Sequence, residues 1–282
     1  MPLSIHRLTE DDLDAAQAIC ELAYGVPRAI KRDLRRYMTL QPDGWVFALL
    51  DGKPAGLGGA TNYGPFAYIG LMTVHPSLQR RGVATAMMDR LLAGIEACGC
   101  PLVLLTATPA GEALYEQRGF VDQDTMRQFV QNDCALRPRL SERVVPMRTD
   151  DLAEVAALDT PIFGANRSVV LAAYRAEYPS RAFVVRDAGG RISGYLFAQI
   201  ETIGPWVAGD RDSAEALLAA ALQLQFEPAP RVLIPGANSS GSALLQRYGF
   251  SPQRTLRHMR RGGDGSPTRR ELLYGQASFA LG

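Results

Sequence analysis

Two arginines, a glycine and an alanine stand close together in the segment TVHPSLQRRGVATAMMDRLL, and their spacing suits the binding of an anion. Gly82 and Ala84 keep the start of the following helix-like segment, 83–97, free of bulky side chains. The first backbone N–H groups of a helix and its positive dipole end favour a phosphate. We therefore predict a pyrophosphate site here, with Arg80 and Arg81 at its rim. The alternative is an ordinary surface helix with two solvated arginines.

The composition excludes several kinds of partner. The chain has 282 residues and a hydrophobic content of 47%, which is enough for a sizeable core. Its 30 Lys and Arg residues balance 29 Asp and Glu residues, so no global field attracts nucleic acid or an anionic membrane. No apolar run approaches the ~18–20 residues that span a bilayer, and the first residues turn acidic where a signal peptide would be apolar. We expect a cytoplasmic protein.

Cysteine and histidine do not form a metal-binding pattern. The four cysteines have no paired C-x-x-C spacing, so we expect reduced structural thiols, and the three histidines lie far apart. No metal site is expected.

The chain repeats itself once. RLTEDDLDAA returns as MRTDDLAEVAAL, and the hairpin-like VFALLDGKPAGLGGA returns as AFVVRDAGGRISGYLFA. YIGLMTV corresponds to TIGPWVA, so that Gly70 matches Gly204. PLVLLTATPAGEALYEQRGF, which ends at Phe120, aligns without a gap on RVLIPGANSSGSALLQRYGF, which ends at Phe250. We expect two copies of one fold.

Each copy passes from helices through three or so strands to a helix, a strand, a helix and a last strand. This order predicts an α+β fold in which a mostly antiparallel mixed sheet is flanked by helices. Proline and charged residues interrupt the pattern in CALRPRLSERVVP, 134–146. We therefore expect two domains, 1–138 and 141–282.

Three ordered motifs of the first copy resemble the GCN5-related N-acetyltransferase (GNAT) superfamily. QRRGVA fits the Q/R-x-x-G-x-G/A signature of that family, with V-x-P before it and LYEQRGF after it at the family's spacing. The second copy is similar to the degenerate C-terminal domain of tandem members such as the bacterial YitH-like proteins, through IGPWVA and PGANSSGSALLQRYGF. This match is the weaker of the two.

The resemblance implies that acetyl-CoA is the cosubstrate and that the acetyl group passes directly to an amine. The implied coenzyme-binding residues are a strand end, whose backbone would hold the pantetheine arm and the thioester oxygen, and the pyrophosphate loop with the first turn of its helix. They are Met72, Thr73, Val74, Gln79, Arg80, Arg81, Gly82, Val83, Ala84 and Thr85. The alternative for the strand end is plain pairing in a closed sheet.

Tyr115 matches the tyrosine that serves such enzymes as the general acid for the departing coenzyme thiolate. A buried core tyrosine is the competing interpretation. Thr108 stands where many relatives carry Asn, and the usual Glu base is missing. The base therefore remains open, with His75 as a weak candidate.

The second copy lacks both functional features. Our alignment sets Asp212 opposite Gly82, with Asp210 nearby, and these carboxylates would repel a pyrophosphate. Leu245 stands at the position of Tyr115. We expect this copy to pack on the first as an internal pseudo-dimer, in a monomer or a homodimer, and to wall the acceptor site or serve a structural role.

Three functions fit these residues. The first is acetylation of a small-molecule amine, the second is acetylation of a protein terminus or lysine, and the third is an idle acetyl-CoA sensor. The presence of Tyr115 argues against the sensor. The chain has no acidic tract that would attract a basic protein tail, which slightly favours a small-molecule acceptor. The segment YGVPRAIKRDLRRY, 24–37, would cover the acceptor side or form a solvated basic face. The sequence does not identify the acceptor.

Overall fold

The computed structural model describes residues 2–25, 30–132, 139–263 and 268–282. Its first half contains the strands and helices β1 (Leu3–Arg7), α1 (Leu13–Tyr24), α2 (Lys31–Leu40), β2 (Trp45–Leu50), β3 (Lys53–Asn62), β4 (Ala67–Val74), α3 (Val83–Ala97), β5 (Val103–Ala107), α4 (Pro109–Glu116) and β6 (Val121–Gln131).

The second half repeats this order. Its elements are β7 (Val144–Pro146), α5 (Leu152–Phe163), α6 (Ser168–Glu177), β8 (Ala182–Arg186), β9 (Ile192–Ala198), β10 (Thr202–Ala208), α7 (Arg211–Ala221), β11 (Arg231–Pro235), α8 (Ser239–Arg247), β12 (Phe250–Arg261) and β13 (Leu273–Gly275). The internal repeat of the sequence is therefore a repeat of structure, with β13 as an addition.

The strands form a mostly antiparallel sheet, which confirms the α+β fold class. Parallel pairing is confined, in the described residues, to β4 with β5 and to β10 with β11. The strands follow the order β1-β2-β3-β4-β5-β12-β6-β11-β10-β9-β8-β7. Both hairpins expected from the sequence are present, as β2–β3 and β8–β9.

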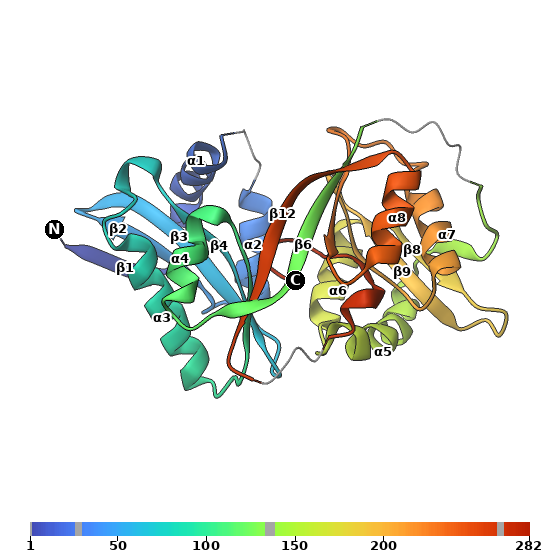
Figure 1. The fold of residues 1–282 in the computed structure, drawn as a ribbon, viewed down its shortest axis with the longest axis horizontal. Coiled ribbons are helices and arrows are strands. Elements are labelled where there is room, and N and C mark those ends of the chain that lie inside the picture. Colours follow the sequence, from blue (N-terminus) through green and yellow to red (C-terminus); the bar gives the residue numbers. More distant parts are fainter. Residues whose placement is uncertain (1, 26–29, 133–138, 264–267) are drawn as a thin grey trace.

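The two halves exchange their last long strands. β12 pairs with β5 of the first half, and β6 pairs with β11 of the second half, so the two strands lie side by side between the halves (Figure 1). Each half therefore needs the other to complete its sheet. The predicted domain limit at residue 138 lies outside the described residues, and the two domain ranges remain a prediction.

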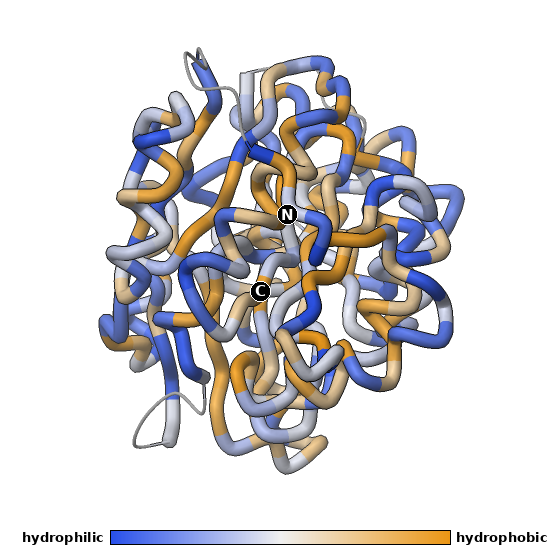
Figure 2. The backbone as a smooth tube through the Cα atoms, turned by 90° about the vertical axis from the view of Figure 1, so that its right-hand side faces the viewer, coloured by the Kyte–Doolittle hydropathy of each residue, from blue (hydrophilic) through white to orange (hydrophobic). Residues whose placement is uncertain are grey.

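Helices cover both faces of the sheet. In the first half, α3 and Tyr115 of α4 pack on one face, and α1 and α2 pack on the other. Alternate residues of β2 point to these two cores, as a pleated strand requires: Phe47 joins the α1 side and Ala48 joins the α3 side. Figure 2 traces the hydrophobic segments through the interior. In the described residues no helix is long and apolar enough to cross a membrane.

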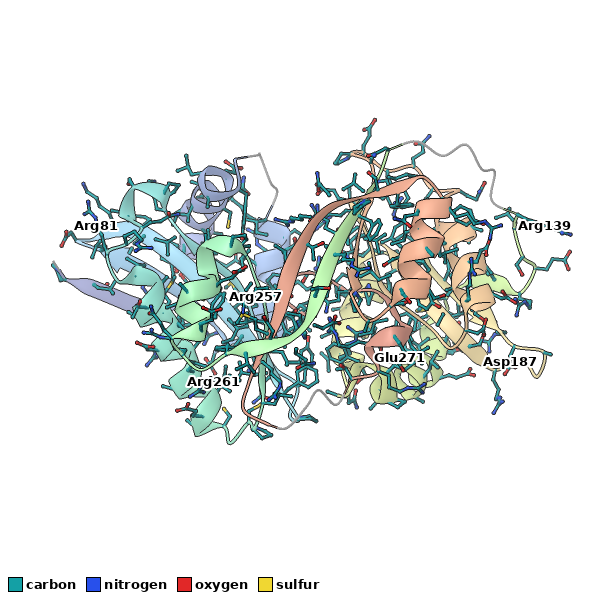
Figure 3. The ribbon with its side chains drawn as sticks, in the orientation of Figure 1. Arg81, Arg139, Asp187, Arg257, Arg261 and Glu271 are labelled. Atoms are coloured by element: carbon teal, nitrogen blue, oxygen red, sulfur yellow. The ribbon has the colours of Figure 1, made fainter. Side chains whose placement is uncertain are left out.

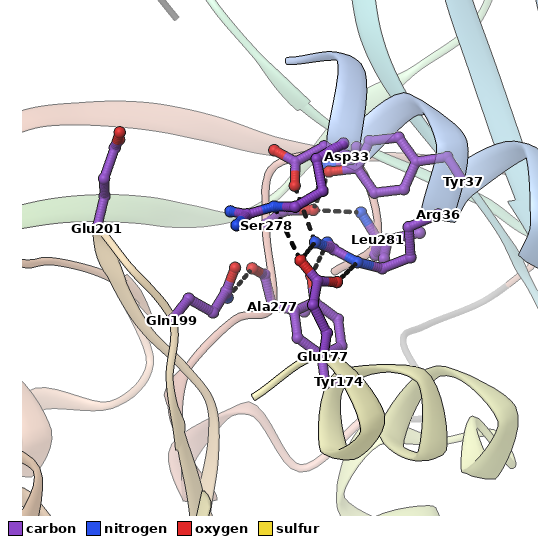
Figure 4. Close-up of polar contacts among 12 residues, drawn as sticks. Asp33, Arg36, Tyr37, Tyr174, Glu177, Gln199, Glu201, Ala277, Ser278 and Leu281 are labelled. Atoms are coloured by element: carbon purple, nitrogen blue, oxygen red, sulfur yellow. Dashed lines mark hydrogen bonds and ion pairs between the residues drawn. The ribbon is translucent and has the colours of Figure 1, made fainter. Parts of the chain in front are cut away.

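The α1–α2 core continues into the second half, where it takes in α5, α6 and β8–β9. A polar contact closes this junction (Figure 4). The buried guanidinium of Arg36 donates to both carboxylate oxygens of Glu177, at 2.7 and 2.9 Å, and to the hydroxyl of Tyr174 at 3.0 Å. A bidentate pair of this kind fixes orientation as well as contact. The inner helices of the two halves are thus held in one arrangement.

Candidate functional site

The loop before α3 presents a row of backbone donors. Gly82 is the N-cap of α3 and has φ 82°, a left-handed conformation that glycine adopts without strain. The backbone N–H groups of residues 80–85 find no acceptor among the described residues. Some of these N–H groups belong to the first turn of α3, where a helix offers them no acceptor, and the others belong to the turn before it. Such a row of N–H groups can cradle a phosphate.

Arg80 and Arg81 lie in this loop, and their place at the rim of a pyrophosphate site stays a prediction. Both are exposed, and neither makes an ion pair within the described part of the chain. Figure 3 places Arg81 at the outer edge of the first half. The side-chain amide of Gln79, which is also exposed, donates to the backbone carbonyl of Val74 at 3.4 Å. The loop therefore offers positive charge and backbone donors at one place.

The helix predicted over residues 83–97 is present in the structure as α3. α3 spans Val83–Ala97, and the apolar residues expected on its inner face are all buried: Val83, Met87, Leu91, Leu92 and Ile95. This face anchors α3 on β3 and β4, so the helix start lies directly beyond the end of β4.

β4 and β5 separate where the resemblance implies a gap. Their pairing runs from Ala67 and Val103 to Ile69 and Leu105 and stops there, whereas β4 continues to Val74. The separation begins at a kink, because Leu71 has φ 55° and the β3–β4 register shifts beside it. No described strand pairs with this edge of β4 beyond Ile69. The edge can therefore accept an extended ligand as an added strand.

The direction of the amides in β4 can be worked out from one bond. The backbone N–H of His75 donates to Ala55 on the β3 side at 2.8 Å. Successive N–H groups of a strand point to opposite edges. Val74 and Met72 therefore direct their N–H groups into the gap, and Thr73 directs its own toward β3. Among the three predicted residues, the N–H of Thr73 therefore does not point into the gap.

Tyr115 lies in α4, the helix that follows β5. Its side chain is 7% exposed and packs edge-on against Phe120. Gly111 makes room for the ring, because a Cβ there would come within 2.7 Å of it. Burial raises the pKa of the Tyr115 phenol, and the nearby Tyr24 raises it further. No described side chain hydrogen-bonds to its hydroxyl. A phenol that stays protonated without an internal partner is suited to donate a proton.

The base is not identified by the geometry. The Nδ1 atom of His75 accepts the backbone N–H of Ser77 at 3.3 Å, so the ring is held in its own turn. Thr108 is the N-cap residue of α4. In the described residues no group of three His, Cys, Asp or Glu side chains could hold a metal. Cys20, Cys98 and Cys100 form no disulfide in the described part of the chain, and Cys134 lies outside it.

Two contacts near the site were not foreseen. The hydroxyl of Tyr24, at the end of α1, lies 3.1 Å from Oγ1 of Thr73. Arg257 of β12 pairs with Glu112 and Glu116 of α4 on either side of Tyr115 in the sequence. Tyr24 opens the segment that the sequence assigned to the acceptor side, of which residues 26–29 lie outside the described residues. Arg257 gave no signal, because its approach depends on the strand exchange.

The corresponding place in the second half is closed at the helix start. Asp210 is the N-cap of α7, and its carboxylate accepts the backbone N–H of Ser213 at 2.7 Å and the hydroxyl of Ser213 at 2.8 Å. The alignment that set Asp212 opposite Gly82 was therefore two residues out, because Asp210 holds the N-cap position and Asp212 lies in the first turn. The carboxylate of Asp210 therefore occupies the helix start, where an external anion would otherwise bind.

The strand gap of the second half is closed as well. β10 and β11 pair only at Thr202 and Ile203, and β13 then lies along the freed edge of β10. Just after β13, the backbone N–H of Gln276 donates to Leu233 of β11 at 2.8 Å, which ties the segment to the other side of the gap. The side chain of Asn238 donates to the carbonyl of Leu273 at 3.0 Å. β13 therefore fills the space that remains open in the first half.

A pocket of about 390 Å³ lies between the halves. Its lining comes from α1 and α2 of the first half and from the β9–β10 turn and β11 of the second, and includes Gln17, Lys31, Arg32, Glu201 and Arg231. A larger pocket of about 570 Å³ lies at the far end of α3, lined by Ala97 and Cys98, away from the loop with the free donors. Of these two pockets, only the one of about 390 Å³ lies on the side of the sheet that α1 covers.

Family comparisons match both halves. Residues 7–120 match the model described as acetyltransferase (GNAT) family, and residues 155–275 match the model described as acetyltransferase (GNAT) domain. No match was found among the curated proteins.

Solved structures share the whole tandem fold. A proposed acetyltransferase from Pyrococcus horikoshii is 28% identical, with 99% of this chain and 96% of that chain covered and a TM-score of 0.87. A GCN5-related N-acetyltransferase from Sphaerobacter thermophilus is 15% identical, with coverage of 94% and 98% and a TM-score of 0.72. A tandem GNAT protein of the clavulanic acid biosynthesis pathway, solved without acetyl-CoA, is 16% identical, with coverage of 94% and 100% and a TM-score of 0.66.

Proposed function

This chain belongs to the GNAT acetyltransferase family and carries two of its domains in tandem, and we propose that its first half transfers the acetyl group of acetyl-CoA to an amine of a small molecule. The family supports acyl transfer in general. The donor, the amine and the residues below are the parts that we propose.

One observation carries the proposal: the unpaired amides of residues 80–85 lie beyond the open edge of β4. A pyrophosphate needs a row of N–H donors, and a pantetheine arm, with its two amides, needs the free edge of a strand. Both are found in the first half, and Arg80 and Arg81 add positive charge at the rim. The residues present therefore fit coenzyme A.

The amides of Met72 and Val74 would hold the thioester. As the amine attacks the carbonyl carbon, negative charge gathers on the carbonyl oxygen, and preorganised N–H donors stabilise it. When the C–S bond breaks, the thiolate gains from a proton. We assign this proton to Tyr115, whose pKa is raised by burial so that it remains protonated at neutral pH.

The acceptor must lose a proton before it attacks, because an alkylamine has a pKa of about 10.4. No side chain of the described site is assigned to remove it, and we propose that water and backbone carbonyls carry it out of the site. The second half closes the sheet beside the site and lines the pocket on the α1 side, where the acceptor would enter.

Two measurements test the function. Calorimetry with coenzyme A should give one site per chain, and a screen of amines should release free thiol from acetyl-CoA. Thiol release with small amines, but not with peptide termini or lysine peptides, supports the small-molecule acceptor. Turnover of peptides only would favour a protein acceptor, and tight binding without turnover of any amine would favour a sensor.

A further inference from the structure

Tyr24 stands at the point where the acceptor would meet the thioester. It is the last residue of α1, the residue is 39% exposed, and its hydroxyl lies 3.1 Å from Oγ1 of Thr73. Thr73 follows Met72, whose amide points into the gap beside β4. Tyr24 therefore reaches the reacting end of the strand from the helix that covers its other face.

The two tyrosines approach this place from opposite faces of the sheet. Tyr115 packs with α3 on one face, and α1 packs with α2 on the other. Tyr24 is nevertheless close enough to Tyr115 to raise the pKa of its phenol. The end of β4, where the gap opens, lies between the two elements. One hydroxyl thus faces the coenzyme side and the other faces the acceptor side.

The hydrogen bonds around Thr73 indicate which of the two hydroxyls, that of Tyr24 or that of Thr73, donates to the other. The hydroxyl of Thr73 donates to the carbonyl of Leu71 at 3.1 Å, and a hydroxyl has one proton to give. Thr73 therefore accepts from Tyr24. A phenolic oxygen that donates its proton in this way can still accept, so Tyr24 suits a ligand group that carries N–H.

The surroundings of Tyr24 on α1 are polar as well. Residues three, four or seven apart share one face of a helix, and Glu21 and Gln17 lie three and seven residues before Tyr24 on that face. The side-chain amide of Gln17 donates to Glu21 at 2.9 Å, and Gln17 also lines the pocket between the halves. A polar track thus leads from Tyr24 toward this pocket.

We propose that Tyr24 is an acceptor-binding residue whose hydroxyl, oriented by Thr73, accepts a hydrogen bond from the N–H of the acceptor amine and aligns its nitrogen with the thioester carbon. The inference rests on the proposed function, since it presumes acetyl-CoA on the open edge of β4. It makes the site selective for a group that can donate a proton, such as an amine, over an ether or a thioether of the same shape.

Coenzyme A derivatives can test this without knowledge of the acceptor. The N-methylamide and the methyl ester of S-carboxymethyl-coenzyme A are nearly isosteric and differ by N–H against O at the acceptor position. Calorimetry should find the amide bound roughly tenfold more tightly than the ester by the wild type, the effect of one hydrogen bond. Tyr24→Phe should bind both equally and bind coenzyme A itself as the wild type does.

Tyr248→Phe is the matched control, because it removes a tyrosine hydroxyl that donates to Glu215 in the second half. This variant should keep the preference for the amide. Equal binding of both probes by the wild type, or a preference that survives in Tyr24→Phe, would overturn the assignment while coenzyme A binding still supports the function. Failure of coenzyme A itself to bind the wild type would overturn both.

Discussion

The open gap of the first half and the closed gap of the second are the most informative pair of regions in this molecule. Both are formed by a strand that leaves its parallel neighbour and by a helix that starts just beyond. In the first half the edge of β4 is unpaired and the start of α3 is uncapped. In the second half β13 pairs with β10, and Asp210 caps α7.

The difference shows that the same arrangement of strand gap and helix start can either stay open for a ligand or be filled by a segment of its own chain. A free strand edge and a bare helix start are costly in a protein, because their polar groups lack internal partners. The second half satisfies them with β13 and the carboxylate of Asp210, at the positions that correspond to the pantetheine and phosphate sites proposed for the first half. The first half leaves them without partners among the described residues, as the proposed binding site requires.

The largest effect is expected from Gly82→Glu. The substitution forces a side chain into φ 82°, at a cost of about 1–2 kcal/mol, and puts a carboxylate among donors meant for phosphate. We expect the affinity for coenzyme A in calorimetry to fall by more than about 100-fold, which corresponds to roughly 3 kcal/mol.

Gly190→Glu provides the control for that variant. Gly190 has φ 81° in the β8–β9 turn of the second half, with open space around it like Gly82, so strain and charge are matched away from the site. It should bind one coenzyme A per chain with unchanged affinity. Binding that survives Gly82→Glu, or two equivalent sites in the wild type, would place the coenzyme elsewhere.

The next effect concerns Tyr115, whose counterpart in the second half is Leu245. Tyr115→Phe should lower kcat by about 100-fold, within the range of general acid catalysis, with little change in the affinity for acetyl-CoA. Because the pKa of Tyr115 is raised, the wild type should lose no activity through its ionisation below about pH 10. Steady-state kinetics with an amine found in the screen measures both, and full activity of the variant would remove Tyr115 from the mechanism.

A smaller effect should show that the second half supports the first. Arg257 lies on β12, and its guanidinium donates to Glu112 at 3.2 Å, to Glu116 at 2.6 Å and to Asp122 at 2.7 Å. It thereby holds α4, the helix of Tyr115. Because the group is partly exposed, we expect Arg257→Met to lower kcat only about three- to tenfold, with KM for acetyl-CoA nearly unchanged.

Arg261→Met is the matched control on the same strand. Arg261 pairs with Glu96 near the far end of α3. Figure 3 shows Arg261 and Arg257 at separate places on the first half. The kcat of this variant should stay within about twofold of the wild type, a change in activation free energy no larger than the contribution of a weak, exposed ion pair. If both variants lose activity equally, β12 supports the sheet in general and not α4 in particular.

The sequence predicted what local patterns encode. Alternation and helical spacing identified both hairpins and the bounds of α3, and the repeat identified the tandem fold. The strand exchange was not predictable, because β6 and β12 carry no signal that says which sheet they join. β13 is only three residues long, so it has no periodic pattern of its own.

The candidate site divides in the same way. Gly82, Arg80 and Arg81 were identified by a contiguous motif, whereas Tyr24 and Thr73 meet across 49 residues of chain. Contacts at that separation depend on the packing of α1 on the sheet, which no single segment specifies. The two-residue error at Asp212 came from placing a gap in a short loop without a buried residue to fix the register.

The smallest effect tests whether the second gap is closed by the cap or by β13. Asp210→Ala removes the two hydrogen bonds to Ser213, and loss of such a cap costs about 1 kcal/mol. Chemical denaturation should report that loss, whereas Asp212→Ala, whose side chain has no partner among the described residues, should change the free energy of unfolding by less than about 0.5 kcal/mol. Neither variant should gain a second coenzyme site in calorimetry, because β13 still pairs along β10 after the carboxylate is gone. A second site in Asp210→Ala would mean that the charge of the cap, and not the strand, keeps coenzyme A out of the second half.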